Sequence, residues 1–110
     1  MLVGSIGGHQ VFPNYAVYDA TKAAVAHLTR NLRAELGPRG VRVKNVEPGL
    51  VTTELGDGMR DTSMKQALGE WRQGFETLRS EDIAAAIAWA AAAPARMNVA
   101  EMIVVPTAQG

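Results

Sequence analysis

Tyr18 and Lys22 place a phenol and an amine four positions apart. Residues at this spacing lie on one face of a helix, so both side chains can reach one site. An ammonium group beside the ring favours the phenolate form, which suits tyrosine for general acid and base chemistry. For the pair alone, a solvated lysine beside a half-buried tyrosine is the preferred interpretation, because the spacing also arises by chance.

Ser5 follows the short apolar run 1–3 and Gly4, thirteen residues before Tyr18. In open parallel sheets, ligands bind beyond the carboxyl ends of the strands. A hydroxyl group at such an end can donate a hydrogen bond to the same substrate oxygen that a tyrosine protonates. Considered alone, Ser5 is better explained as a turn residue.

Pro48 and Gly49, with Val51 and Thr53 after them, follow a second predicted strand at its carboxyl end. Glycine permits a ligand to approach the backbone closely, and the amides and hydroxyls that follow can bind an amide-bearing ring. Considered alone, an ordinary Pro-Gly turn is the better explanation of this segment.

The elements that must position these residues alternate along the chain. Strands are predicted at 1–3, 41–46 and 101–105, helices at 17–36, 64–78 and 83–93, and a loop at 50–58. This alternation predicts an α/β fold, with a parallel sheet covered by helices. Three strands are few for a doubly wound sheet, so we expect residues 1–110 to be part of a larger domain.

Local signals set the expected helix ends and faces. The first helix has one face of apolar or small residues, and it is expected to stop at Gly37, in a left-handed conformation, and Pro38. Ser80 is the expected N-cap of the last helix. The face of the first helix consists of Val17, Thr21, Ala24, Leu28, Leu32 and Leu36.

The composition excludes several kinds of chemistry. The chain has no cysteine, so disulfides, thiolate catalysis and cysteine-ligated metals are excluded, and His9 and His27 are too few for a metal site. We expect these histidines in a loop and on a helix surface. Eleven basic and eleven acidic residues cancel, which argues against nucleic acid and membrane partners. With no signal peptide and no apolar run approaching about 20 residues, a cytoplasmic protein is predicted.

Taken together, these motifs resemble the short-chain dehydrogenase/reductase family over essentially all 110 residues. The resemblance is carried by the order and spacing of three groups and by flanking sequence. The groups are Ser5 with Gly8, Tyr18 with Lys22, and Pro48-Gly49 with Val51 and Thr53. The flanking matches are Arg33-Ala34-Glu35-Leu36, Gly40-Val41-Arg42-Val43 and Pro106-Thr107-Ala108-Gln109.

The resemblance implies an NAD(P)-dependent oxidoreductase that interconverts a small carbonyl compound and a secondary alcohol. Tyr18 would be the general acid or base, Lys22 would favour its phenolate and bind the nicotinamide ribose, and Ser5 would orient the substrate oxygen. The segment containing Pro48, Gly49, Val51 and Thr53 would contact the nicotinamide end of NAD or NADP. Gly4 and Asp19 depart from the usual family residues, and we expect neither change to affect the chemistry.

The implied fold is a partial Rossmann-like three-layer sandwich, the C-terminal catalytic portion of the family's domain. Relatives carry a glycine-rich turn and a catalytic asparagine in an N-terminal nucleotide-binding half, and these motifs are missing from the 110 residues. Because that turn holds the pyrophosphate at a helix N-terminus, we expect the isolated chain to bind cofactor weakly. A homo-oligomer is implied for the full-length parent, with the helix 17–36 packing on a partner helix.

Other interpretations stay open. The chain is either the catalytic part of an enzyme, a non-catalytic interaction module, or a truncated gene product without a role of its own. The stripe formed by Met64, Leu68, Trp71, Phe75 and Leu78 is explained equally well as core or as a helix covering the substrate. The sequence does not distinguish NAD from NADP and does not identify the substrate or the reaction direction.

Overall fold

Three parallel strands form the centre of the computed structural model, which describes residues 1–54, 58 and 60–110. The strands are β1 (Leu2–Val3), β2 (Asn45–Pro48) and β3 (Glu101–Val104), and they pair in the order β1-β2-β3. Their carboxyl ends point to the same edge of the sheet, where a ligand site is expected.

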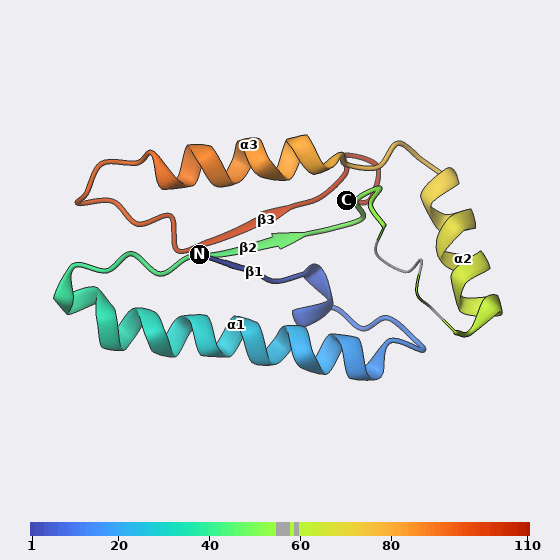
Figure 1. The fold of residues 1–110 in the computed structure, drawn as a ribbon, viewed down its shortest axis with the longest axis horizontal. Coiled ribbons are helices and arrows are strands. Elements are labelled where there is room, and N and C mark those ends of the chain that lie inside the picture. The colour runs from blue at the N-terminus through green and yellow to red at the C-terminus, as the bar shows by residue number, and fades with distance from the viewer. Residues whose placement is uncertain (55–57, 59) are drawn as a thin grey trace.

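Helices cover both faces of this sheet. α1 (Ala16–Leu36) runs along one face and α3 (Ser80–Ala91) along the other, while α2 (Thr62–Gln73) lies beyond the carboxyl ends of the strands (Figure 1). The predicted α/β architecture of a parallel sheet between helical layers is therefore confirmed. No helix in the described part of the chain combines the length and apolarity needed to cross a bilayer.

The central strand differs from its prediction in position and burial. β2 begins at Asn45, four residues after the predicted start, and continues to Pro48. Asn45, Val46 and Glu47 are all about 1% exposed, so the alternation of residue types does not produce alternating burial. A strand between two parallel neighbours, with a helix over each face, is buried on both sides whatever its side chains are.

α1 is confirmed as a long helix, but its predicted apolar face is not its buried face. Val17 is 80% and Leu28 48% exposed, whereas Ala26 and Thr29 are buried. The Thr29 hydroxyl donates to the carbonyl oxygen of Val25 at 2.7 Å, which satisfies it within the helix. The expected packing on a partner helix stays a prediction.

The turn after α1 is also corrected. Gly37 has a helical φ of −55°, and the chain continues into the 3₁₀ turn η2 (Gly37–Arg39). The left-handed residue is Gly40, at φ 80°. In this turn, Gly40 is therefore the residue that needs the conformational freedom that side-chain-bearing residues lack.

α2 is shorter than predicted and α3 begins differently. α2 ends at Gln73, so Leu78 lies outside it and pairs with Val51 in an isolated parallel bridge. Arg79, not Ser80, precedes the first turn of α3, and its N–H donates to the Asp82 carboxylate at 2.8 Å. Of the predicted loop 50–58, residues 55–57 lie outside the described part of the chain.

Candidate active site

Ser5 is held at the end of β1 by a tight turn. It precedes the 3₁₀ turn η1 (Ile6–Gly8), and its Oγ accepts a hydrogen bond from the Gly7 N–H at 3.1 Å. The preceding residue is fixed to the sheet, because the Gly4 N–H donates to the carbonyl oxygen of Val46 at 2.7 Å. Ser5 is 9% exposed, and its side chain borders a cavity at this edge of the sheet.

Tyr18 and Lys22 share one face near the start of α1, as their spacing predicts. The Lys22 Nζ lies 5.6 Å from the centroid of the Tyr18 ring and donates to the carbonyl oxygen of Val3 at 3.3 Å. This hydrogen bond ties the amine to β1, the strand that leads to Ser5. An ammonium group in this position can stabilise negative charge on the phenol.

The segment after β2 reaches the same cavity through Pro48, Gly49, Val51 and Thr53. The close approach at Gly49 is to the chain's own C-terminal segment, because a Cβ atom there would lie 2.9 Å from Val105 Cγ1. Glycine at this position is therefore explained by packing within the chain.

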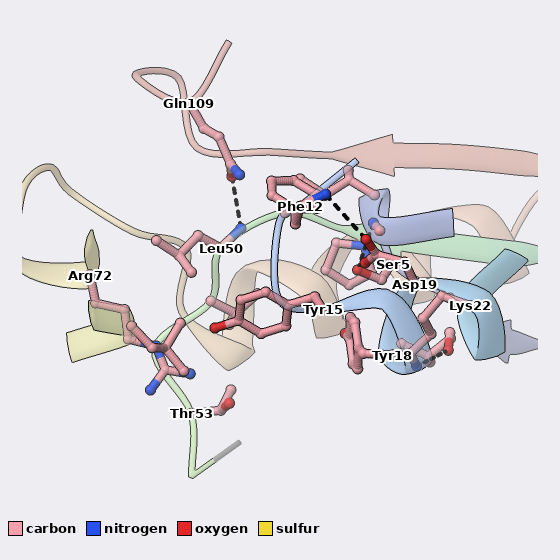
Figure 2. A pocket seen from close by; sticks show the side chains of 18 of the residues that line it. Ser5, Phe12, Tyr15, Tyr18, Asp19, Lys22, Leu50, Thr53, Arg72 and Gln109 are labelled. Carbon is pink, nitrogen blue, oxygen red and sulfur yellow. Dashed lines mark hydrogen bonds between the residues drawn. The ribbon is translucent and has the colours of Figure 1, made fainter. Parts of the chain in front are cut away.

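The seven residues predicted for catalysis and cofactor contact all line this one cavity, which has a volume of about 660 Å³. Ser5, Tyr18 and Lys22 gather on one side of it, and Thr53 lies towards the opposite side (Figure 2). The hydroxyl, phenol and amine thus come from two elements but face a common space. Such an arrangement can hold a small oxygen-bearing molecule and transfer a proton to or from it.

α2 supplies part of the cavity wall through Leu68 and Trp71, whereas Met64 is not among the lining residues. The Trp71 ring lies 5.8 Å from the ring of Phe12, which comes from the loop before α1. Two of the residues proposed to cover a substrate therefore border the cavity. The position of Leu68 and Trp71 agrees better with a helix that covers the substrate than with a stripe of residues buried in the core.

Sequence reasoning missed several residues of the wall. Gln109 closes one side, and its Oε1 accepts the Leu50 N–H at 2.8 Å (Figure 2). Asp19, next to Tyr18, also lines the cavity, and one of its oxygens accepts the Phe12 N–H at 3.2 Å. Arg72 reaches into it from α2 (Figure 2). Only the polarity of Asp19 beside the predicted catalytic tyrosine was a usable local signal.

Within the described residues there is no cluster of three or more histidine, cysteine or acidic side chains that could hold a metal ion. One buried amine with a shifted pKa lies outside the cavity. Burial, with a smaller effect of Arg42, lowers the pKa of Lys44, whose Nζ donates to the Asn98 side chain at 2.8 Å.

Comparison with known sequences finds a reductase family model and relatives that are named as reductases or dehydrogenases. A family model described as enoyl-(acyl carrier protein) reductase matches residues 1–106. Sulfoacetaldehyde reductase 2 of Chromohalobacter salexigens is 37% identical over 107 residues, covering 97% of this chain and 42% of the relative. An NADP-dependent 3-hydroxy acid dehydrogenase of Salmonella typhi is 34% identical over 107 residues, covering 97% and 43%. The chain thus spans less than half the length of these relatives.

Solved structures show the same arrangement of elements. The closed form of a serine dehydrogenase complexed with NADP+ has a TM-score of 0.87 and 32% identity, covering 99% of this chain and 44% of that one. A short chain dehydrogenase of Mycobacterium paratuberculosis bound to NAD has a TM-score of 0.73 and 31% identity, covering 94% and 42%. With a family model matched over nearly its whole length and these structural neighbours, the chain belongs to the short-chain dehydrogenase/reductase family.

Proposed function

We propose that this chain carries the catalytic centre of an NAD(P)-dependent oxidoreductase that interconverts a small carbonyl compound and a secondary alcohol. The observation that carries the proposal is the convergence of Ser5, Tyr18 and Lys22 on one cavity beside the segment 48–53. NADP+ and NAD bound to the structural relatives support the cofactor class.

The chain's own groups divide the proton chemistry between them. Tyr18 gives its phenolic proton to the substrate oxygen in reduction and takes it back in oxidation, and the Lys22 ammonium stabilises the intervening phenolate. Ser5 Oγ accepts from Gly7, so its own proton is free to be donated to the same substrate oxygen. The bound nicotinamide would supply or accept the hydride.

The cavity fits the nicotinamide end of such a cofactor. Lys22 brings an amine suited to ribose hydroxyls, and the segment from Pro48 to Thr53 brings backbone amides and a hydroxyl to the same wall. The 110 residues contain no glycine-rich turn for a pyrophosphate. We therefore propose that residues 1–110 act as the C-terminal catalytic portion of a larger dinucleotide-binding unit.

The decisive experiment joins this chain to the preceding half of a relative and measures cofactor-dependent turnover. Tyr18→Phe should lower kcat by about 10²–10⁴-fold, because the proton donor is lost. Tyr15→Phe is the matched control, since Tyr15 also lines the cavity and should retain most activity. Turnover that survives Tyr18→Phe unchanged would refute the assigned role.

We further propose a small substrate bearing an anionic group. Besides Lys22, Arg72 brings a positive charge to the cavity, from the side opposite Ser5 and Tyr18 (Figure 2). The names of relatives refer to sulfoacetaldehyde and 3-hydroxy acids, whose sulfonate or carboxylate suits a guanidinium.

Arg72→Gln should lower kcat/KM for a 3-hydroxy acid by more than about tenfold while changing that for a neutral alcohol of similar size much less. Arg72→Lys, which keeps the charge, should recover part of the loss. Equal losses for both substrates would show that Arg72 does not recognise the anion.

A non-catalytic interaction module remains the second candidate. Val3 on the edge strand β1 is 50% exposed, Ile103 on the other edge strand 59%, and Val17 on α1 80%. Such apolar exposure is typical of surfaces that pack on another element or subunit. Size-exclusion chromatography with light scattering tests it, and a stable, well-folded monomer without a partner would count against it.

A further inference from the structure

Behind Ser5 lies a buried polar cluster that the proposed chemistry does not use. Asn45 and Glu47, on β2, are each about 1% exposed. Glu47 accepts from Asn45 Nδ2 at 2.5 Å through Oε1, and its Oε2 lies 2.6 Å from Nε2 of His9. His9 itself is partly exposed, with 33% of its side-chain surface accessible. His9 thus lies in a turn outside the regular helices and strands, as the sequence predicts, but its ring contacts Glu47 and does not line the cavity.

A carboxylate this deeply buried needs hydrogen-bond donors, because water no longer solvates it. Asn45 and His9 supply one donor to each of its oxygens. The contact with His9 is charge-assisted and hence stronger than a bond between neutral groups. Glu47 thus links β2 to a residue of the loop on the opposite side of Ser5.

The cluster holds both ends of the segment that carries Ser5. At the front end, the Gly4 N–H is bound to the Val46 carbonyl, and a Cβ atom on Gly4 would lie 2.7 Å from Asn45 Oδ1 and 3.2 Å from Glu47 Cγ. At the rear end, the His9 N–H closes the turn onto the Ile6 carbonyl at 2.9 Å while its ring reaches Glu47. Ser5 therefore lies between two attachments to one strand.

We propose that His9 is a positioning residue: through its contact with Glu47 it clamps the turn Ile6–Gly8 and so fixes the direction of the Ser5 hydroxyl. The proposal rests on the catalytic role proposed for Ser5. In the proposed reaction the Ser5 hydroxyl and the Tyr18 phenol bind the same substrate oxygen. A restrained turn keeps the hydroxyl in place for this, and small displacements of a reacting group lower rates strongly.

The test compares two substitutions in the chain joined to the preceding half of a relative. His9→Phe keeps a ring but removes the donor, and should lower kcat by about tenfold with little change in the cofactor KM. His9→Gln carries an amide nitrogen that can replace Nε2, and should recover most of kcat. A His9→Phe variant with unchanged kcat would overturn the proposal.

A double-mutant cycle with Ser5 separates positioning from general stabilisation. In a Ser5→Ala background, His9→Phe should lower the residual kcat by less than about twofold, because the hydroxyl it positions is gone. The same tenfold loss in both backgrounds would show a merely structural role and refute the proposal.

Amide hydrogen exchange on the 110-residue chain gives a readout that needs no activity. His9→Phe should speed exchange of the Gly7 and Gly8 amides at least about tenfold relative to amides of α3, and His9→Gln should not. This result would stand even if Tyr18 proved dispensable, so failure of the proposed function and failure of the clamp are distinguishable. Uniform change across the chain would contradict the clamp.

Discussion

Gly4 and Gly7, on either side of Ser5, are explained by polar side chains that occupy the space where a Cβ atom would lie. At Gly4 this is the Asn45 amide, and at Gly7 it is the Asp19 carboxylate, whose Oδ1 would be 2.6 Å away. The Asp19 carboxylate thus occupies space that is open only because residue 7, in the turn that carries Ser5, is a glycine. The two departures from the usual family residues, Gly4 and Asp19, both border the turn that carries Ser5.

Gly7→Ala should destabilise the chain by about 1–3 kcal/mol, because the new methyl group meets Asp19 Oδ1 and lies 3.3 Å from Tyr18 Cε1. Urea unfolding measures the loss, and the double variant Gly7→Ala with Asp19→Ser should recover much of it. Gly69→Ala is the control: nothing lies within 4 Å of its Cβ position in α2, so a gain of about 0.5–1 kcal/mol is expected. Similar losses at both glycines would contradict this explanation.

At the scale of elements, Arg42 holds the end of α3. Its Nη1 donates to the carbonyl oxygens of Ala93 at 2.8 Å and Met97 at 3.3 Å, and its Nη2 to that of Ala91 at 3.3 Å. The Ala91 carbonyl belongs to the last turn of α3, where carbonyls lack a partner within the helix and lie at the negative end of the helix dipole, and the other two belong to the segment that follows.

Arg42→Met should lower the free energy of unfolding by about 1–3 kcal/mol, because several carbonyls lose a charged donor. Arg42→Lys keeps the positive charge but lacks the planar guanidinium group. Its free energy of unfolding should therefore lie between that of the methionine variant and that of the parent chain. The measurement is urea unfolding followed by circular dichroism. Equal stability of the methionine variant and the parent chain would show that water replaces the arginine without loss.

A second link between elements depends on pH. Arg30 of α1 donates through Nε to the Glu101 carboxylate of β3 at 2.7 Å, and this hydrogen bond lowers the pKa of Glu101 below its ordinary value of 4.5. A carboxyl whose pKa is depressed on folding stabilises the fold above its ordinary pKa, and that contribution is lost as the pH falls through the lowered value.

Glu101→Gln should therefore lower the urea midpoint at pH 7 and have little effect at an acid pH below the lowered pKa of Glu101, where its carboxyl is as neutral as the glutamine amide. The loss at pH 7 should be small, because both side chains are about one-third exposed or more and solvent screens the pair. A difference between variant and parent that is the same at both pH values would exclude the ion pair as its cause.

At the scale of the whole molecule, the contacts that we propose for the cavity account for only one end of a dinucleotide. The proposed nicotinamide contacts come from residues 18–53, and the sequence holds no turn for the pyrophosphate. Titration of the 110-residue chain with reduced cofactor, followed by fluorescence, should give a Kd above about 1 mM. Saturable micromolar binding would show that these residues provide most of the affinity themselves.

Much of the architecture and of the proposed site follows from local sequence. Periodicity and breakers predict the order of strands and helices, and the i,i+4 spacing predicts that Tyr18 and Lys22 share a face. Ser5 and Pro48-Gly49 are predicted at strand ends, where parallel sheets bind ligands. These predictions succeed because they depend on hydrogen-bonding patterns a few residues long.

Only the tertiary structure decided which faces are buried and which distant residues meet. The buried face of α1 holds Ala26 and Thr29 instead of Val17 and Leu28, and His9 reaches Glu47 across 38 positions of sequence. Gln109 likewise returns to Leu50 across 59. Such contacts arise because β2 lies between two parallel strands and between helices on the two faces of the sheet, an arrangement that no local pattern contains.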